Sequence, residues 1–286
     1  MSAPSLPSLL LTHWQLEGSV LAPAAVGAAL YLGAAGRVRA RWPAGRTLCF
    51  LVGIAVIVVA LDSGLGTWDD RLLSSHMAQH MLLLLIAPLL LLGGRPVVLL
   101  LAALPPGARP RPARALAATR GYTGPLPSLG FFTAAVVLTH LPSFYDATLR
   151  HPALHYGEHL VYLTAGLLLL SPLLHGDPAP RHRLGGLGTL AYVMASMVPM
   201  AVVGAFLNRH AGVFYAPYAP PAQALGVSAV DDQAQAGAIM WVLGNSIMVA
   251  IGLWAAVAAM VAEERRQAAR EARGVGVTGC DGGLRA

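Results

Sequence analysis

Charged residues are scarce in this chain of 286 residues. They make up 11% of it, against about 25% in a typical soluble domain. Hydrophobic residues make up 56%, and the mean hydropathy is +0.62. Several apolar runs approach the roughly 20 residues that a helix needs to cross a bilayer. This composition excludes an ordinary soluble protein and predicts an all-α, polytopic membrane protein with the lipid bilayer as its surroundings.

Lysine is absent, so all 19 basic residues are arginine, and the formal net charge is +6. Arginines that flank membrane spans set the orientation of the spans, and we therefore expect no nucleic-acid partner. Cysteine is nearly absent, because Cys49 and Cys280 form neither a CxxC pair nor a disulfide framework. The N-terminal stretch lacks a basic segment before a long apolar run, so no cleavable signal peptide is expected.

The apolar stretches predict a bundle of seven transmembrane helices. They lie at about residues 16–36, 47–66, 72–93, 126–141, 152–174, 187–207 and 234–262. Residues 96–104 are apolar but too short to cross, and we expect them at the interface or packed on the bundle. The predicted domains are an outer N-terminal segment (1–15), a transmembrane domain (16–262) and a basic cytoplasmic tail (263–286), disordered beyond about residue 272.

The arginines fall unevenly about these spans. If the segment after the first span is cytoplasmic and the sides alternate, three arginines lie outside, namely Arg71, Arg150 and Arg209. The sixteen on the cytoplasmic side are Arg37, Arg39, Arg41, Arg46, Arg95, Arg109, Arg111, Arg114, Arg120, Arg181, Arg183, Arg265, Arg266, Arg270, Arg273 and Arg285. This asymmetry predicts seven spans, with the N-terminus outside and the C-terminus in the cytoplasm.

Histidines gather on the other side of this topology. Eight of the ten lie at or near the outer face: His13, His76, His80, His140, His151, His155, His159 and His210. The other two, His175 and His182, fall in a cytoplasmic loop. Ionisable residues in membrane segments are costly to insert and usually functional. The outer halves of the third, fourth and fifth spans are therefore the predicted site.

The spacing of these histidines favours a shared metal site. His76 and His80 are four residues apart, as are His155 and His159, so each pair shares one face of a helix. His140 ends the fourth span at the same predicted depth. A single histidine at a membrane interface more often forms ordinary hydrogen bonds, but the joint pattern favours a bound metal or cofactor.

Methionines follow the first pair. Met77 and Met81 each come one residue after a histidine, so they are turned about 100° from it around the helix. Imidazole suits copper, zinc, iron and nickel, while thioether sulfur selects Cu(I). A methionine in a bundle usually only fills space in the core. The mixture nevertheless indicates copper first, as Cu(I), with Met77 and Met81 as auxiliary ligands and zinc as the alternative metal.

The fifth span also contains "HYGEH", in which His155, Glu158 and His159 match the HxxEH motif of zinc proteases. The remaining glutamates do not supply the distant ligand that such a protease needs, so we expect no enzyme. Glu158 is better placed to accept a hydrogen bond from a ligating imidazole. A further alternative is a membrane haem protein, with His80 and either His155 or His159 as axial ligands.

The seventh span opens with "VDDQAQAGAIMW". Asp232 can cap this helix, or can stand at the outer mouth of the site and attract a cation. Gly237 permits close contact with another helix.

Three segments together, "SSHMAQHMLLLLIAPLLLLGGRPV", "HLPSFYDATLRHPALHYGEHLVYLTAGLLLLSPLL" and "DDQAQAGAIMW", resemble the CtaG family of polytopic cytochrome c oxidase assembly factors, the Bacillus-type CtaG. The resemblance covers about residues 15–262. It implies a multi-pass protein of the bacterial plasma membrane, a metallochaperone that supports copper insertion into the oxidase. The implied partners are oxidase subunits and an extracytoplasmic copper donor. The motif residues of the family fall on His76, His80, His140, His155, His159 and Asp232.

Overall fold

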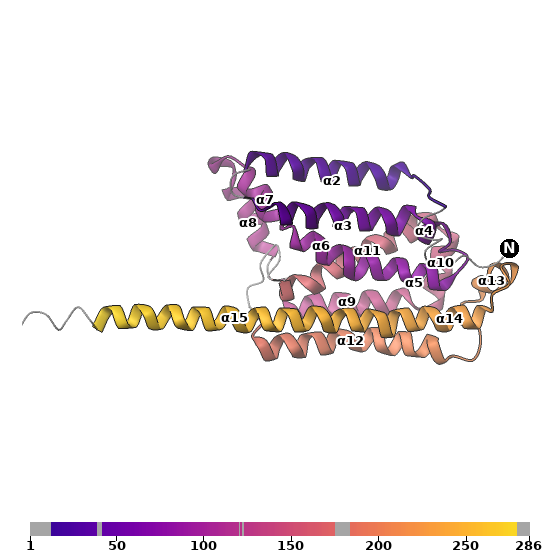
Figure 1. Ribbon diagram of the computed structural model, residues 1–286. Coiled ribbons are helices and arrows are strands. Elements are labelled where there is room, and N and C mark those ends of the chain that lie inside the picture. The colour runs from indigo at the N-terminus through magenta and orange to yellow at the C-terminus, as the bar shows by residue number, and fades with distance from the viewer. Residues whose placement is uncertain (1–12, 39–41, 120, 122, 175–183, 279–286) are drawn as a thin grey trace, which may run out of the picture.

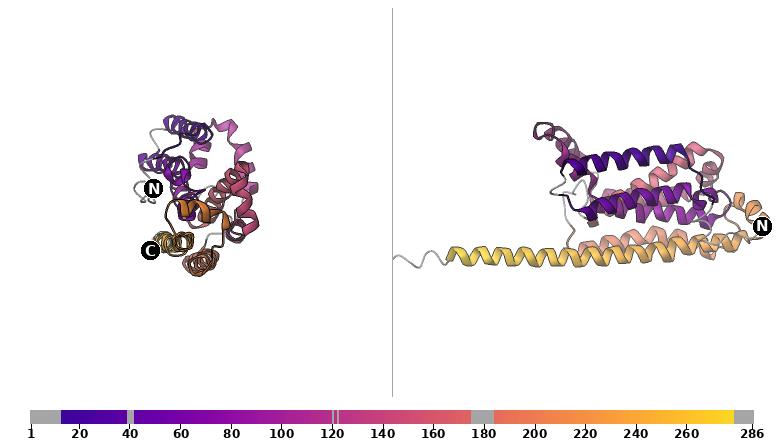
Figure 2. Two further views of the ribbon diagram at one scale, coloured as in Figure 1. Left: turned by 90° about the vertical axis from the view of Figure 1, so that its right-hand side faces the viewer. Right: turned by 45° about the horizontal axis from the view of Figure 1, so that its top comes forward.

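Figure 1 shows the computed structural model, which describes residues 13–38, 42–119, 121, 123–174 and 184–278. Every regular element in these residues is helical. Long apolar helices lie side by side in a bundle, and shorter helices connect them at its two ends (Figures 1 and 2). The all-helical membrane class predicted from composition is confirmed.

The bundle is made of single helices and of helix runs with a π-helical turn inside them. The single helices are α2 (Gly18–Arg37), α3 (Ala44–Asp62), α9 (Pro125–Thr139), α11 (Pro152–Leu174) and α12 (Gly186–Arg209). The first run is α5 (Leu73–Met81), the π turn η2 (Leu82–Ile86) and α6 (Ala87–Gly93). The second run is α14 (Ala229–Ala238), the π turn η5 (Ile239–Gly244) and α15 (Asn245–Thr278).

Short helices close the two ends of the bundle. At one end lie α4 (Gly64–Thr67), α10 (Pro142–Arg150), the 3₁₀ turn η4 (Ala216–Tyr218) and α13 (Ala219–Ala224). At the other end lie α7 (Pro96–Ala103), the 3₁₀ turn η3 (Pro106–Ala108) and α8 (Pro110–Thr119). The first end holds the starts of α5, α11 and α14, and therefore carries the histidines (Figure 1).

Six runs among the described residues are long and apolar enough to cross a membrane. They are Gly18–Arg37, Ala44–Thr67, Leu73–Ala103, Pro152–Leu174, Gly186–Arg209 and Ala229–Glu271. The predicted fourth span differs from these. Its helix α9 has 15 residues, about 22 Å of helix, and joins α10 through a 74° bend. Pro142 explains the break, because proline cannot continue the hydrogen bonding of the preceding helix. When α9 and α10 are counted together as one bent span, the number of candidate spans is seven.

The ends of the predicted spans agree with the structure to different degrees. The predicted fifth span, 152–174, has the bounds of α11. The seventh begins earlier than predicted, at Ala229, because Ser228 caps the helix there. Its last helix continues to Thr278, and residues 279–286, with Cys280, lie outside the described residues. His175 and His182 also lie outside them.

The short helix α7 is packed on the bundle, as residues 96–104 were predicted to be. Arg95 adopts a left-handed conformation with φ 48°, which turns the chain out of α6 and into α7. Leu99 of α7 is fully buried in a cluster with Tyr31 and Phe50. The Tyr31 hydroxyl donates a hydrogen bond to the Gly94 carbonyl at 2.7 Å, which holds this turn against α2.

Glycines let three pairs of elements approach one another closely. The backbones of Gly204 in α12 and Gly237 in α14 touch, which confirms the close contact predicted at Gly237. Gly166 in α11 lies directly against the Leu84 carbonyl of η2, where a side chain would collide with backbone. Gly244 of η5 lies against the side chains of Met81 and Met200. These contacts fix how deep α5, α11 and α14 sit relative to each other.

Candidate metal centre

The helix α5 carries the first two histidines, and a neighbouring helix fixes its start. The Asp232 carboxylate in α14 accepts a hydrogen bond from the Leu73 backbone N–H at 2.6 Å and another from the Ser74 N–H at 3.3 Å. The Ser74 hydroxyl also donates to it. A carboxylate is favourable at a helix N-terminus, where backbone N–H groups lack partners. Asp232 therefore holds α5 in place beside α14.

This corrects the prediction that Asp232 caps its own helix. The N-cap of α14 is Ser228, whose hydroxyl oxygen accepts a hydrogen bond from the Asp231 N–H at 3.3 Å. Asp232 already lies in the first turn of α14, and its side chain points across to the free N–H groups of α5.

Four histidines from two helices meet at the centre of this end. The ring centroids of His76 and His80 in α5 are 4.1 Å apart, and those of His155 and His159 in α11 are 4.4 Å apart. Across the helices, His76 stacks on His155 at 5.2 Å and His80 meets His159 at 5.9 Å. His76 and His80 are fully buried, and His155 is partly exposed. The predicted i, i+4 pairs thus form one cluster.

The buried atoms of this cluster lack hydrogen-bond partners. These atoms are His76 Nε2, both ring nitrogens of His80, His155 Nε2, His159 Nδ1 and both carboxylate oxygens of Glu158. Polar atoms that are buried without a partner are rare in folded proteins, because each has lost its water without compensation. These imidazole nitrogens and carboxylate oxygens are donors that fit a metal ion.

Two groups of three side chains lie close enough together to hold a metal ion. Asp69, His76 and His155 form the first group, and His76, His80 and Glu158 form the second. In each group the candidate ligand atoms lie within 4.8 Å of one another. His155 Nε2 and Asp69 Oδ2 are 3.6 Å apart. Two ligands held at about 2.0–2.1 Å from a tetrahedral ion would stand about 3.4 Å apart, so this spacing fits a bridging ion.

Asp69 was not among the residues singled out from sequence. It lies in the turn between α4 and α5, and burial raises the pKa of its carboxyl to about 7, against a hydrogen bond from Gln79 that lowers it. A bound cation would favour the charged carboxylate again. The signal in the sequence was the acidic pair in "TWDD" just before the histidine helix.

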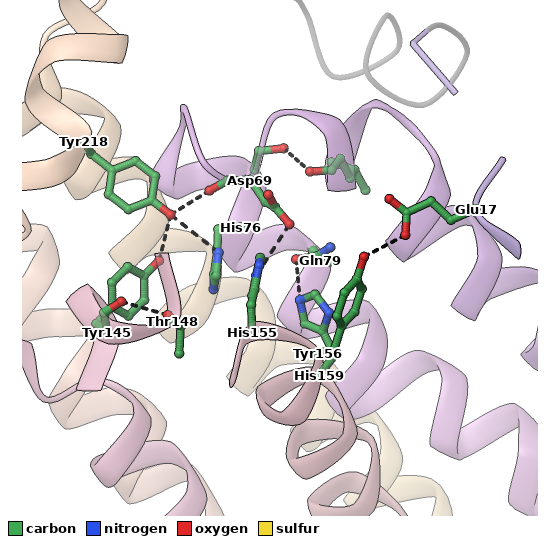
Figure 3. Close-up of polar contacts among 12 residues, drawn as sticks. Glu17, Asp69, His76, Gln79, Tyr145, Thr148, His155, Tyr156, His159 and Tyr218 are labelled. Atoms are coloured by element: carbon green, nitrogen blue, oxygen red, sulfur yellow. Dashed lines mark hydrogen bonds and ion pairs between the residues drawn. The ribbon is translucent and has the colours of Figure 1, made fainter. Parts of the chain in front are cut away.

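Gln79 was missed as well, and it orients two groups of the cluster. It lies beside Asp69, where its side chain lowers the pKa of the carboxyl, and its oxygen is 3.1 Å from His159 Nε2 (Figure 3). An amide oxygen only accepts, so His159 Nε2 carries the proton. The unpartnered Nδ1 of His159 is then left with its lone pair free to bind a metal.

His140 lies beside the cluster and not in either group of three. Its Nδ1 is 2.7 Å from the Val136 carbonyl, which can only accept, so Nδ1 carries the proton and the unpartnered Nε2 has the lone pair. Tyr162 separates His140 from the other histidines. Its hydroxyl is 3.4 Å from His140 Nδ1, and its ring stacks on His80 with centroids 4.0 Å apart.

A tyrosine fixes the other side of the cluster. The Tyr218 hydroxyl donates to the Asp69 carbonyl at 2.6 Å and lies 3.1 Å from the Tyr145 hydroxyl (Figure 3). The same oxygen is 3.5 Å from His76 Nδ1. Tyr218 belongs to η4, so the loop before the seventh span also shapes the site.

The predicted methionine ligands lie deeper, in the main hydrophobic core. Met77 is fully buried and Met81 is 3% exposed. The Met81 sulfur lies against Gly244 of η5, on the α14 side of the helix, whereas the histidines meet α11. This agrees with the 100° turn between each methionine and the histidine before it.

The remaining histidines at this end lie apart. His13 packs edge-on against Trp68 at 5.8 Å, and His210 packs against Phe206 and Phe214. His151 precedes α11, as Pro152 predicts, and its side chain is exposed.

A polar cavity of about 260 Å³ leads from the surface to the cluster. Its walls include the carboxylates of Glu17, Asp69 and Asp70, and the imidazoles of His155 and His159. His76, His80 and Glu158 do not line it. A cation that arrives from this end would therefore meet carboxylates first.

The comparison with known protein families gives one family. The profile of the cytochrome c oxidase caa3 assembly factors (Caa3_CtaG) matches residues 29–262. That range contains every residue of both groups of three.

Mycobacterial proteins are similar over nearly the whole chain. Uncharacterized protein Mb0105 of Mycobacterium bovis is 29% identical over 94% of this chain and 43% of its own length. Uncharacterized protein ML1998 of Mycobacterium leprae is 28% identical over 99% of this chain and 45% of its own length. The chain thus spans less than half the length of these relatives. No solved structure matches.

Proposed function

The chain belongs to the family of cytochrome c oxidase caa3 assembly factors, and from this premise we propose that it binds copper near the outer membrane face and supports copper insertion into the oxidase. We place it in the bacterial plasma membrane, with oxidase subunits and an extracytoplasmic copper donor as partners. Copper is its cargo, and we propose no catalytic role.

The proposed topology has seven spans, with the N-terminus outside and the C-terminus in the cytoplasm. The bent pair of α9 and α10 is counted as the fourth span. The direction of the chain then alternates along the bundle, and the histidine end faces outward. The excess of arginine in the segments that lie on the other side of the membrane in this topology supports this orientation.

The observation that carries the proposal is the group of unpartnered nitrogen and oxygen atoms on His76, His80, His155, His159 and Glu158. We propose the four histidines as the principal ligands. Imidazole nitrogen suits copper and zinc, and the family membership favours copper. His140, Met77 and Met81 are proposed as auxiliary ligands, and Asp232 as the group that positions α5.

The geometry favours an ion over the alternatives. A haem would need a gap for a porphyrin plane, but the rings of His80 and Tyr162 stack directly at 4.0 Å. A zinc protease would need Glu158 to reach water and substrate. Glu158 is 1% exposed and does not line the polar cavity.

The test is metal analysis of the full chain purified in detergent from copper-supplemented cells. The double variant His76→Ala/His80→Ala should lose the copper that the wild type retains. His151→Ala is the matched control, because this exposed histidine lies on the same end and should leave the copper content unchanged. Equal copper in the wild type and the double variant would overturn the site, and zinc in place of copper would overturn the assignment of the metal.

A further inference from the structure

We infer that the metal centre consists of two overlapping stations that share His76. The outer station is Asp69, His76 and His155, and the inner station is His76, His80 and Glu158. A metal ion binds first at the outer station and then moves to the inner one without leaving His76. This inference rests on the proposed metal-binding function and names the route that the ion takes within that site.

The contacts separate the two stations and also connect them. Each set of three ligand atoms lies within 4.8 Å, and neither set contains both carboxylates. The transfer is a ligand exchange. The ion releases the Asp69 carboxylate and His155, keeps His76, and gains His80 and the Glu158 carboxylate. One carboxylate ligand replaces another, and no electron moves.

Exposure gives the route its direction. Asp69 and His155 line the polar cavity, and the His155 side chain is 19% exposed. His76 and His80 are fully buried and Glu158 is 1% exposed, outside the walls of that cavity. An ion from the outer surface therefore reaches Asp69 and His155 before it reaches Glu158. Glu17 and Asp70 add negative charge at the cavity, which attracts cations toward it.

Unmet hydrogen bonding favours the second step. Both ring nitrogens of His80 and both carboxylate oxygens of Glu158 are buried without partners. The outer station adds one such atom of its own, His155 Nε2. A buried polar atom without a partner raises the free energy of the folded protein. An ion at the inner station gives partners to more such atoms than an ion at the outer station does. The inner station is therefore the resting place of the ion, and the outer station sets how fast it is loaded.

The experiment measures capture rate and retention separately on the full chain in detergent. Copper is supplied as Cu(II), which suits nitrogen and oxygen donors, from a chromophoric chelator. Its transfer is followed by rapid-mixing absorbance, and the copper left after excess chelator is then measured. Asp69→Asn should slow capture about tenfold and leave retention unchanged. Changes around a metal site typically cost about 10–100-fold, and this is the lower end of that range. Glu158→Gln should leave capture unchanged and lower retention by a similar factor. Asp70→Asn is the matched charge control: it removes a carboxylate from the same cavity outside both stations, and should slow capture by much less than Asp69→Asn.

Each result decides between the readings. A wild type that takes up no copper overturns the proposed function itself. A wild type that binds copper, with variants that lose capture and retention together, shows a single site and overturns only the two stations. If Asp70→Asn slows capture as much as Asp69→Asn does, capture depends on the negative charge of the cavity, and the outer station is overturned. His155→Gln and His80→Gln repeat the outer and inner tests, and should reproduce the split if either carboxylate variant fails to fold.

Discussion

The two halves of the bundle bury different kinds of polar side chain. Around the start of α5 and α11, the buried polar groups include ionisable ones: Asp62, Asp69, His76, His80, His140, Glu158, His159 and Asp232. In the half beyond η2, the buried polar residues of the described chain are serine, threonine and asparagine, such as Ser128, Ser171 and Thr189. One half is thus packed for stability, while the other keeps ionisable groups that burial disfavours. The proposed metal site would account for that difference.

The largest expected effect tests the packed half at Gly166. Gly166→Ala places a Cβ against the Leu84 carbonyl and Pro88, so α11 cannot keep its contact with η2. We expect a loss of about 3 kcal/mol in the free energy of unfolding. Thermal unfolding in detergent measures it.

Gly157→Ala is the control on the same helix, because a Cβ there meets nothing within 4 Å. It should gain about 0.5–1 kcal/mol from the better helix propensity of alanine. If the two variants unfold alike, close packing does not distinguish the deeper half.

The second effect concerns Asp232, an ionisable group of the histidine half that has partners. Asp232→Ala leaves the Leu73 and Ser74 N–H groups without an acceptor at the start of α5. We expect a loss of about 2 kcal/mol in unfolding free energy. Asp231→Ala removes an exposed neighbour in the same helical turn and should change stability by less than about 0.5 kcal/mol. Equal losses would mean that the carboxylate does not hold α5.

Much of this arrangement could be predicted from sequence, because it depends on local spacing. The four-residue intervals put each histidine pair on one helical face, and the bounds of α11 follow from Pro152 and an apolar run. The uneven arginines placed both pairs at one end. These signals lie within single helices or in their flanks, so no knowledge of tertiary contacts was needed.

The rest depends on contacts between distant segments. Asp69 reaches His155 across the bundle, and Asp232 caps a helix that begins 159 residues before it in the chain. No spacing rule joins such residues. The π turns η2 and η5 were likewise hidden, because their own residues are continuously apolar.

The third effect has the opposite sign and bears directly on the comparison. Glu158→Leu removes two buried carboxylate oxygens that lack partners, while its neighbour Thr148 keeps its hydrogen bond to the Tyr145 carbonyl. We expect the metal-free variant to be about 1–2 kcal/mol more stable than the metal-free wild type, and to retain less copper. Thermal unfolding after treatment with a chelator measures the first change. A less stable variant would show that Glu158 supports the fold, and the contrast between the halves would weaken.

The smallest effect concerns the hydroxyl that fixes the edge of the cluster. Tyr218→Phe removes the donor to the Asp69 carbonyl and the contact with His76 Nδ1, but keeps the buried ring. A hydrogen bond lost from a buried carbonyl lowers unfolding free energy by about 1 kcal/mol. Because Asp69 and His76 both lose an orienting contact, copper affinity should fall about tenfold, as measured by chelator competition. Tyr156→Phe makes the same chemical change at the exposed rim, where the hydroxyl bonds Glu17 at 2.7 Å, and should alter neither quantity measurably. If Tyr218→Phe lost stability but kept its copper affinity, the tyrosine would serve the fold alone, and the boundary between the two halves would lie inside the histidine end.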